Sequence, residues 1–344
     1  MHNILNTLYV MTPQAYAHLE NATVRIDVEH VKRLQVPLHH LSGLVTFGNV
    51  MVSPALMHRL ADEGKSLVLL DEHGRFKARL EGPVSGNILL RQAQHKVANE
   101  PTAALEHARA CVAGKLRNSR VNLQRGAREA ADADEAAQLT RIADNLSASL
   151  RAANTVASLD ELRGVEGEAA RGYFAALNLI VKPQARAAFA LDGRTRRPPL
   201  DRFNALLSFL YSMLMNDCCS ALEAVGLDPQ LGFLHAVRPG RAALALDLQE
   251  EFRSILADRL ALTLINRGQL GADDFETREG GAVSLSEKGR RAVVTAWQER
   301  KQEEITHPLL ETRLPIGLLP LIQARFMART LRGEMDGYLP YLAK

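Results

Sequence analysis

The spacing of apolar residues in this 344-residue chain changes near Gly82 and Pro83, and this change constrains the fold more than any other feature. Before it, short apolar and β-branched runs are separated by turn residues, which is typical of strands. After it, apolar residues recur every three or four positions through long segments, which is typical of amphipathic helices. The sequence therefore predicts an α+β protein, with a small β-rich domain at residues 1–86 and a larger all-α domain at residues 87–344.

Five strands and one helix are predicted in the β-rich domain. Ser53 is expected to cap the helix, with Pro54 at its first position and Gly64 just beyond its end. The turn residues at 81–87 predict a hinge between the domains. The strands are expected at residues 6–10, 22–28, 44–47, 67–70 and 76–80.

The second domain is predicted to contain helices and no strand. Residues 185–202 interrupt the helices with a glycine, two prolines and five arginines, which favours a mobile basic loop. This loop is either an ordinary solvated surface or a clamp for a phosphate backbone. The helices are expected at residues 88–114, 115–131, 133–155, 158–178, 203–225, 247–267, 286–304 and 314–336.

The helix predicted at 158–178 has an unusual glycine content around Glu166. Ser158 and Glu161 have the spacing of a capping box, so Glu166 is expected two turns inside the helix. Three glycines nearby each cost about 1 kcal/mol relative to alanine in a helix interior. They indicate either close helix packing or room for a bulky partner beside the carboxylate. The glycines are Gly164, Gly167 and Gly172.

Two further segments contain candidate metal ligands. Asp247 and Glu250 are three residues apart, so they share a helical face and either cap the helix or hold an ion. The apolar stripe of that helix predicts that Glu251 lies toward solvent, which favours Glu250 as the ligand. His235 stands in a loop-like segment, as a structural histidine or as a third ligand.

Composition permits several functional classes and excludes others. The chain has 42 Lys and Arg against 39 Asp and Glu, a net charge of +3, so an anionic partner is allowed but not required. The first 85 residues contain eight residues of each sign, and the basic excess therefore lies in the second domain. Three cysteines predict no disulfide framework or zinc site. No signal-peptide pattern or 18-residue apolar span is evident, which predicts a cytoplasmic protein with no membrane contact.

The segments LRGVEGEAARGYF, DPQLGFLHAVRPGR and LALDLQEEFR, with GRTRRPPLDRFNALLSFLYSML between the first two, together resemble the Cas1 family of CRISPR adaptation integrases. The resemblance maps the family's metal ligands to Glu166, His235 and Glu250, with Asp247 as a supporting acid. The sequence of the histidine segment is most similar to type I systems, and within them to subtype I-C. The resemblance covers the whole chain and implies a β-rich dimerisation domain followed by a helical catalytic domain.

The resemblance also implies a reaction and its partners. A Mg²⁺ or Mn²⁺ ion would assist the 3′-hydroxyl of a short DNA fragment in attacking a phosphodiester of the CRISPR array, and with water as nucleophile the centre would be an endonuclease. The partners implied are double-stranded and branched DNA, a second copy of the chain, and the small companion protein Cas2.

Five arginines near these segments are expected to neutralise DNA phosphates. Two other functions stay open from the residues alone: a metal-dependent phosphoesterase acting on small substrates, and a non-catalytic helical DNA-binding scaffold in which Asp247 and Glu250 only cap a helix. The arginines are Arg196, Arg197, Arg238, Arg241 and Arg253.

Overall fold

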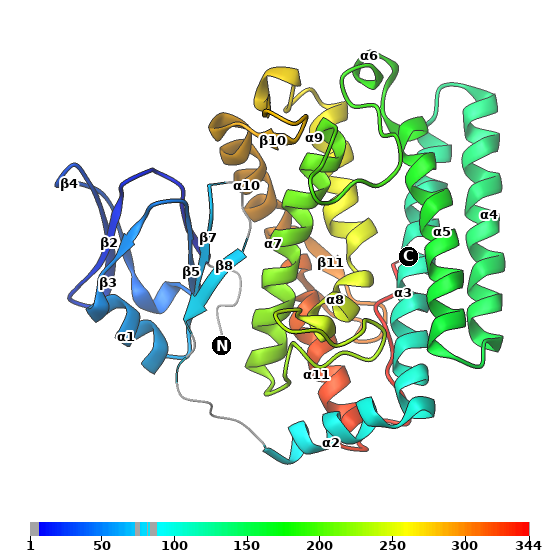
Figure 1. The fold of residues 1–344 in the computed structure, drawn as a ribbon, viewed down its shortest axis with the longest axis horizontal. Coiled ribbons are helices and arrows are strands. Elements are labelled where there is room, and N and C mark those ends of the chain that lie inside the picture. Colours follow the sequence, from blue (N-terminus) through cyan, green and yellow to red (C-terminus); the bar gives the residue numbers. More distant parts are fainter. Residues whose placement is uncertain (1–6, 73–75, 81, 83–87, 344) are drawn as a thin grey trace. The chain divides into compact units, whose positions relative to one another are not determined.

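The computed structural model describes residues 7–72, 76–80, 82 and 88–343, and the chain divides into compact units at residues 1–85 and 86–344 (Figure 1). The first unit contains the predicted β-rich region and the second is mostly helical. Apart from Gly82, the predicted hinge at 81–87 lies outside the described residues.

The described part of the first unit forms two four-stranded sheets. One has the order β1-β5-β7-β8, in which only the β7–β8 pair is antiparallel, and the other has the order β4-β3-β2-β6. A core of apolar side chains from both sheets and helix α1 includes Leu44, Leu56 and Leu67. The elements are β1 Thr7–Val10, β2 Tyr16–Glu20, β3 Thr23–Val28, β4 Val31–Pro37, η1 Leu38–His40, β5 Gly43–Phe47, β6 Met51–Val52, α1 Pro54–Asp62, β7 Ser66–Leu70 and β8 Phe76–Leu80.

Helix α1 has the predicted ends. The Ser53 side chain accepts a hydrogen bond from the Leu56 amide at 3.2 Å, Pro54 is the first helical residue, and Gly64 follows the helix with a φ of 62°. Strands β2, β4 and β6 were not predicted. β4 and β6 are at the edges of their sheet, where many side chains are exposed and no alternation of apolar and polar residues is needed.

In the second unit, the first two predicted helices have a different boundary. The prediction placed a break between residues 114 and 115, but the chain breaks at Glu100, and Pro101 starts a 29-residue helix that continues through this position. Proline fits a first helical turn because its missing N–H has no helical partner there. The long helices are α2 Ile88–Asn99, α3 Pro101–Glu129, α4 Ala133–Thr155, α5 Leu159–Ile180 and α7 Arg202–Ala224.

The prediction that this unit contains no strand was wrong. Two short antiparallel pairs occur, β9 Phe275–Thr277 with β10 Val283–Leu285, and β11 Glu304–Thr306 with β12 Arg313–Pro315. Each strand has three residues, which is too short to produce a recognisable alternation. The final helices are correspondingly shorter than predicted: α10 Glu287–Gln302 and α11 Leu319–Leu331.

The segment predicted as one helix at 247–267 is three elements. α8 Ala243–Glu250 starts earlier than expected, the chain then forms a π-helical segment at Arg253–Asp258, and α9 Arg259–Asn266 follows. The remaining short elements are α6 Pro183–Arg186, η3 Ala272–Asp274 and η4 Ile316–Leu318.

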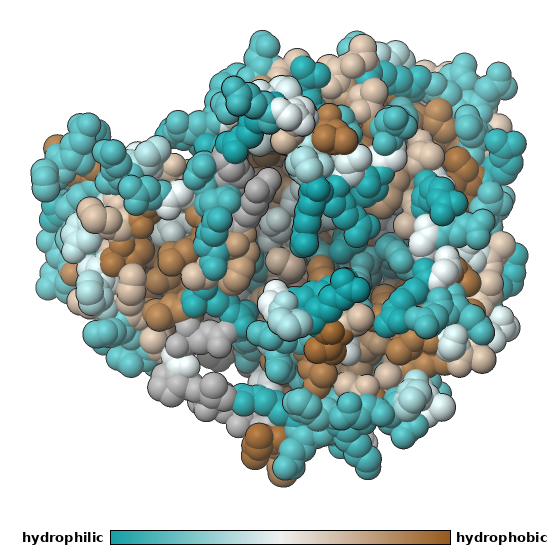
Figure 2. Space-filling view, viewed as in Figure 1, coloured by the Kyte–Doolittle hydropathy of each residue, from teal (hydrophilic) through white to brown (hydrophobic). Residues whose placement is uncertain are grey.

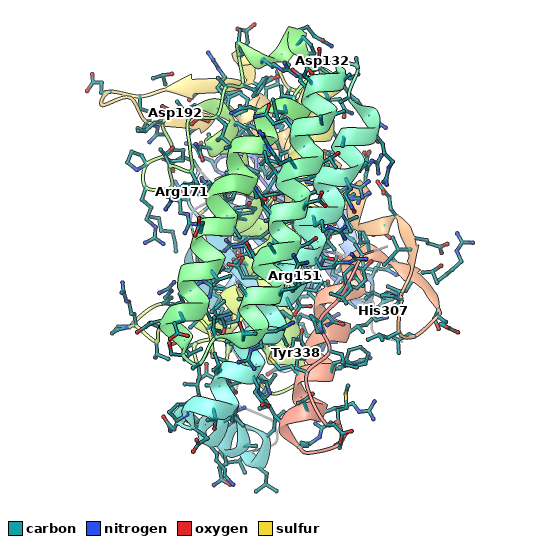
Figure 3. All side chains as sticks on the ribbon, turned by 90° about the vertical axis from the view of Figure 1, so that its right-hand side faces the viewer. Asp132, Arg151, Arg171, Asp192, His307 and Tyr338 are labelled. Carbon is teal, nitrogen blue, oxygen red and sulfur yellow. The ribbon has the colours of Figure 1, made fainter. Side chains whose placement is uncertain are left out.

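Helices α3, α4 and α5 lie side by side along one edge of this unit (Figure 3), while α7 is in its core. Within the described residues, α7 is the one helix long and apolar enough to span a membrane, and 61% of its most apolar window is buried inside the protein. This helix contains polar residues such as Asn204, Asn216 and Asp217 and is largely buried, as the core helix of a folded domain is. Hydrophilic side chains cover much of the face shown in Figure 2.

Candidate metal centre and nucleic-acid interface

Glu166 lies inside α5, as predicted. The Ser158 hydroxyl caps this helix by accepting a hydrogen bond from the Glu161 amide at 3.2 Å. The Glu161 carboxylate accepts a hydrogen bond from the backbone amide of Ala157, and not from that of Ser158, so the capping box is displaced by one residue. The Glu166 side chain retains 24% of its accessible surface, which leaves its carboxylate open to a ligand.

The glycines around Glu166 line an open side of α5. Within the described part of the chain, and apart from the helix backbone itself, no atom comes within 4 Å of a Cβ built at Gly164, Gly167 or Gly172. The helix-packing explanation of these glycines was therefore wrong. The absence of side chains at these positions leaves the α5 backbone beside Glu166 accessible to a large ligand.

His235 is in the loop between α7 and α8, and the base of this loop is fixed by α2. The Gln94 side-chain amide donates to the Asp228 and Leu231 carbonyls at 2.8 Å and accepts from the Asp228 amide at 2.9 Å. Arg163 of α5 donates to the Leu234 carbonyl at 2.9 Å, which connects the loop to the helix that carries Glu166.

Asp247 receives four hydrogen bonds from this loop. The backbone amides of Phe233 and Leu234 donate to Oδ2 at 2.6 and 2.9 Å. The amide and Nδ1 of His235 donate to Oδ1 at 3.0 and 2.6 Å. Gly232 permits this approach, because a Cβ there would lie 2.7 Å from Oδ2 of Asp247. Asp247 therefore orients the imidazole and leaves Nε2 as its free nitrogen.

The capping explanation of Asp247 and Glu250 was wrong. Helix α8 begins at Ala243, with Ala242 at the N-cap and no side-chain capping bond, so Asp247 lies in the middle of the helix and Glu250 is its last residue, and neither is at the N-terminus. The sequence suggested a cap because Asp247 and Glu250 have the spacing of a capping box and are followed by an apolar helical run. The two carboxylates instead point to His235 and its surroundings.

Glu250 is buried among positive charges. Its Oε1 is 3.1 Å from Nη1 of Arg253 and 3.8 Å from Nε2 of His235, and its Oε2 is 2.7 Å from Nζ of Lys115. Burial alone would raise the pKa of Glu250, but Arg253, Lys115 and His235 outweigh it and hold the pKa at about 2. Glu250 is therefore a full carboxylate at neutral pH.

Lys115 of α3 connects Glu250 to Glu166. Its Nζ forms a second, very short ion pair with Oε1 of Glu166, so one ammonium bridges the carboxylates of α5 and α8. Sequence reasoning missed this residue. The available signal was a lysine within the small and apolar run CVAGKL, where a buried charge requires partners.

Glu251 was predicted to lie toward solvent, and this was wrong. Its carboxylate is fully buried and pairs with the Tyr338 hydroxyl, the Gln323 amide at 3.2 Å and the Tyr341 backbone amide at 2.7 Å. Burial raises the pKa of Glu251 to about 8. The C-terminal segment covers the face of α8 that a single amphipathic stripe would leave in water.

In the described ranges, no three acidic, cysteine or histidine side chains are placed so that they could hold a metal ion as they stand. The ammonium of Lys115 is a cationic stand-in, because it occupies the space between Glu166 and Glu250. The free Nε2 of His235 faces the same Glu250. Two carboxylates and an imidazole suit Mg²⁺ or Mn²⁺.

Four of the five predicted phosphate-binding arginines are available to a ligand. Arg196, Arg197 and Arg238 are exposed, and Arg241 is half-buried. Burial lowers the pKa of Arg241, and the nearby charges of Arg238 and Arg197 lower it further, which indicates one basic cluster. Arg253 differs, because its side chain is only 12% exposed and is engaged by Glu250 and the ring of Tyr211.

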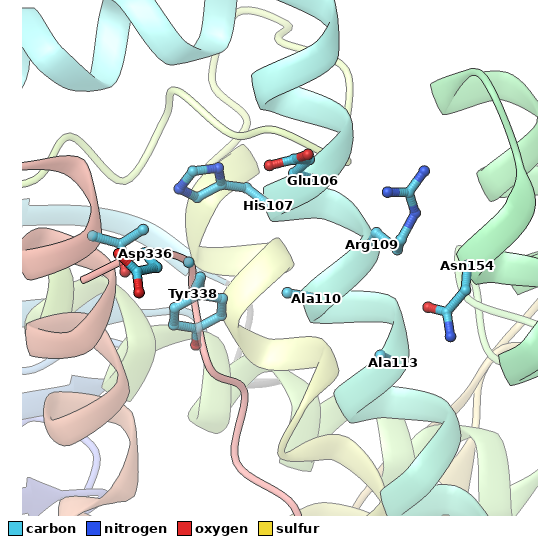
Figure 4. Close-up of a pocket in the computed structure, with 10 residues that line it drawn as sticks. Glu106, His107, Arg109, Ala110, Ala113, Asn154, Asp336 and Tyr338 are labelled. Carbon is cyan, nitrogen blue, oxygen red and sulfur yellow. The ribbon is translucent and has the colours of Figure 1, made fainter. Parts of the chain in front are cut away.

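A cavity of about 310 Å³ lies elsewhere in this unit, between α3 and the C-terminal segment (Figure 4). Glu106, His107 and Arg109 contribute from α3, and Asp336 and Tyr338 from the C-terminal segment. As far as the described residues show, none of the predicted site residues lines this cavity. It is therefore distinct from the candidate metal centre.

Comparison with known proteins assigns the chain to a family. The family model described as CRISPR associated protein Cas1 matches residues 8–299. A relative from Moorella thermoacetica, named CRISPR-associated endonuclease Cas1 1, is 52% identical over 342 residues, and the alignment covers 99% of both chains.

Two solved structures share the fold. A Cas6-RT-Cas1–Cas2 complex matches with a TM-score of 0.83 and 23% identity, covering 98% of this chain and 36% of that one. A casposase bound to integration product matches with a TM-score of 0.82 and 21% identity, covering 98% and 94%. With a family model matched over most of its length and a relative aligned from end to end, the chain belongs to the Cas1 family of CRISPR-associated endonucleases.

Proposed function

We propose that the chain is a metal-dependent DNA endonuclease and integrase, which inserts short DNA fragments into a CRISPR array. The observation that carries this proposal is the convergence of three segments, distant in sequence, on one cation-binding space. Glu166 and Glu250 share one ammonium, and Nε2 of His235 faces Glu250. The names of the casposase and of the Cas1–Cas2 complex support DNA integration as the use of such a centre.

Glu166, His235 and Glu250 would hold a Mg²⁺ or Mn²⁺ ion. When bound, the ion supplies charge stabilisation at the attacking and leaving oxygens of a phosphodiester. The carboxylate of Glu250 is ionised well below neutral pH and needs no deprotonation to serve as a ligand. Asp247 holds Nδ1 of His235, so the imidazole presents Nε2 without rotating.

The DNA backbone would be held by the basic cluster of Arg196, Arg197, Arg238 and Arg241, which adjoins the His235 loop. These arginines can neutralise phosphates without reading sequence. The open side of α5 at Gly164, Gly167 and Gly172 would let the duplex reach Glu166. Arg253 is better suited to hold Glu250 in place than to contact DNA, because its guanidinium is already paired.

We also propose where the protein acts, its oligomeric state and its partners. The chain would act as a cytoplasmic homodimer held together by the β-rich unit. It would bind double-stranded and branched DNA and assemble with Cas2 in a type I system of subtype I-C. Two copies would present two centres, as insertion of both ends of a fragment requires.

Substitution of the ligands tests the centre. Glu166→Ala and His235→Ala should each abolish the joining of a labelled 3′-hydroxyl DNA end to a supercoiled target in Mg²⁺ or Mn²⁺. Circular dichroism should show an intact fold. Glu168→Ala is the matched control, since this acid is an exposed residue of the same helix and should retain joining. Normal joining by either ligand variant would contradict the proposal.

The alternatives have less support. The scaffold hypothesis required Asp247 and Glu250 to cap α8, which neither does. No observation specifically favours a phosphoesterase of small substrates, and a steep loss of DNA binding with added salt would argue against it.

A further inference from the structure

We propose that Lys115 is an internal counter-ion of the metal centre, which competes with the divalent cation for Glu166 and Glu250. This inference rests on the proposed function, because it assumes that these two carboxylates are metal ligands. It adds a fourth residue to the centre and assigns it a role in setting metal affinity.

The position of Lys115 carries the inference. Its Nζ is 2.7 Å from Oε2 of Glu250 and forms a still shorter contact with Oε1 of Glu166. The Lys115 side chain is only 10% exposed, and that of Glu250 only 3%, so these charges are poorly solvated. Buried ions of this kind need a partner, because an unpaired charge in the interior is strongly destabilising.

The carboxylate oxygens of Glu166 and Glu250 cannot bind both the Lys115 ammonium and a divalent ion without weakening one of the two interactions. A cation that binds both Glu166 and Glu250 must displace Nζ or be held close to its positive charge, and both reduce affinity. Lys115 would therefore keep the two carboxylates together while metal is absent and weaken metal binding when it is present.

A neutral side chain in place of Lys115 distinguishes competition with the metal ion from a purely structural role. Lys115→Met should leave Glu166 and Glu250 without their shared counter-ion, so the full-length variant should melt below wild type in chelator. It should bind Mn²⁺ on the order of tenfold more tightly, since no ammonium competes. Because ligand binding to the folded state raises stability by mass action, Mn²⁺ should raise its melting temperature more than that of wild type.

Lys301→Met is the matched control. Lys301 is also buried and ion-paired, with its Nζ 3.0 Å from Oδ1 of Asp217, but this pair involves none of the proposed ligands. The control should melt lower in chelator and show the same Mn²⁺ affinity and the same Mn²⁺-dependent gain as wild type. If Lys115→Met does not fold, Lys115→Gln provides a neutral side chain of similar length that can still donate to one carboxylate.

The experiment measures free Mn²⁺ by electron paramagnetic resonance and thermal unfolding with and without Mn²⁺, and it does not depend on activity. Unchanged or weaker Mn²⁺ binding by the neutral Lys115 variant would overturn the role of Lys115. Glu250→Gln separates this failure from failure of the proposed function. If wild type binds no Mn²⁺, or Glu250→Gln binds it as wild type does, the metal centre itself is refuted.

Discussion

Nδ1 of His235 donates a hydrogen bond to Oδ1 of Asp247 at 2.6 Å, and this bond fixes which nitrogen of the imidazole is left for a ligand. Asp247 can only accept here, because its oxygens already receive three backbone amides. Nδ1 therefore carries a proton, and Nε2 is the ring nitrogen that faces Glu250. The single carboxylate of Asp247 therefore both orders the loop and fixes the orientation of the His235 ring.

Asp247→Asn should disturb this arrangement. The amide would place an N–H₂ group against donors that need an acceptor, so His235 would lose its fixed orientation. We expect Mn²⁺ affinity and DNA joining to fall by roughly 10- to 100-fold. Asp217→Asn is the control, because Asp217 pairs with Lys301 and should change stability without changing Mn²⁺ affinity. Wild-type Mn²⁺ affinity in Asp247→Asn would show that the tautomer is not set by this bond.

Neighbouring glutamates in α8 should respond differently to the same change. Glu250→Gln removes a charge that a cation needs, so joining should collapse. Glu251→Gln should retain joining, because a glutamine can accept from Gln323 and the Tyr341 amide while donating to Tyr338. Joining assays on the two purified variants check this. Loss of joining in Glu251→Gln alone would transfer the ligand role to Glu251.

Asp258 should make the fold less stable as the pH rises. Burial raises its pKa to about 6, although the hydroxyls of Tyr211 and Tyr173 donate to it and Arg253 and Arg194 are nearby. The protonated form is thus favoured by folding, so its contribution is complete below the unfolded pKa of 3.8 and is lost as the pH rises through 6.

Asp258→Asn tests this dependence, because an amide cannot ionise. Relative to the variant, wild type should lose on the order of 2 kcal/mol of unfolding free energy between pH 4 and 7. Urea unfolding at several pH values would measure the difference. A difference that is constant over this range would contradict the raised pKa.

The exposed arginines should control the salt dependence of DNA binding. Arg197→Ala and Arg238→Ala should each weaken binding of any duplex and reduce the slope of log affinity against log salt by about 1. Fluorescence anisotropy at several salt concentrations measures this slope. Arg291→Ala is the control, because Arg291 is an exposed arginine of α10 paired with Glu287 and should leave the slope unchanged. An unaltered slope in both test variants would remove the basic cluster from the interface.

The β-rich unit should hold the homodimer together. The edge strands β4 and β6 expose Leu34 and Met51, with 43% and 59% of their surfaces accessible. The double variant Leu34→Glu and Met51→Glu should be a monomer in size-exclusion chromatography with light scattering, because a dimer would have to bury the introduced charges in its interface. Phe76→Glu, on β8 of the other sheet, is the comparison. If only Phe76→Glu is a monomer, the dimer interface lies on the sheet that contains β8. If both variants remain dimers, the β-rich unit does not form the dimer interface.

The residues proposed from the sequence for the candidate site are those that can be recognised by residue type. Glu166, His235 and Glu250 stood out because carboxylates and imidazoles are the usual ligands of hard cations. Lys115 was missed because a search for ligands does not look for a cation that takes their place. The change in periodicity indicated the β-rich and helical units, whereas three-residue strands such as β9 contain too few positions to show a period.

The incorrect position of Glu251 has a different cause. An amphipathic pattern assigns one face of a helix to solvent, but α8 is also covered by Tyr338 and Tyr341, which are almost ninety positions further along the chain. The contact of a remote C-terminal segment leaves no local trace in the sequence around α8. Its burial could be found only when the whole unit was folded.

The π-helical turn at Arg253–Asp258 changes the direction in which the side chains of α9 point relative to those of α8. A π-turn accommodates one residue more than an α-turn, and one residue corresponds to about 100° of rotation around a helix axis. A helical wheel drawn continuously from Asp247 to Asn266 therefore assigns the wrong direction to every side chain in α9. Deleting one residue from the turn would keep the sequence almost unchanged while rotating α9 relative to the helix that carries Glu250.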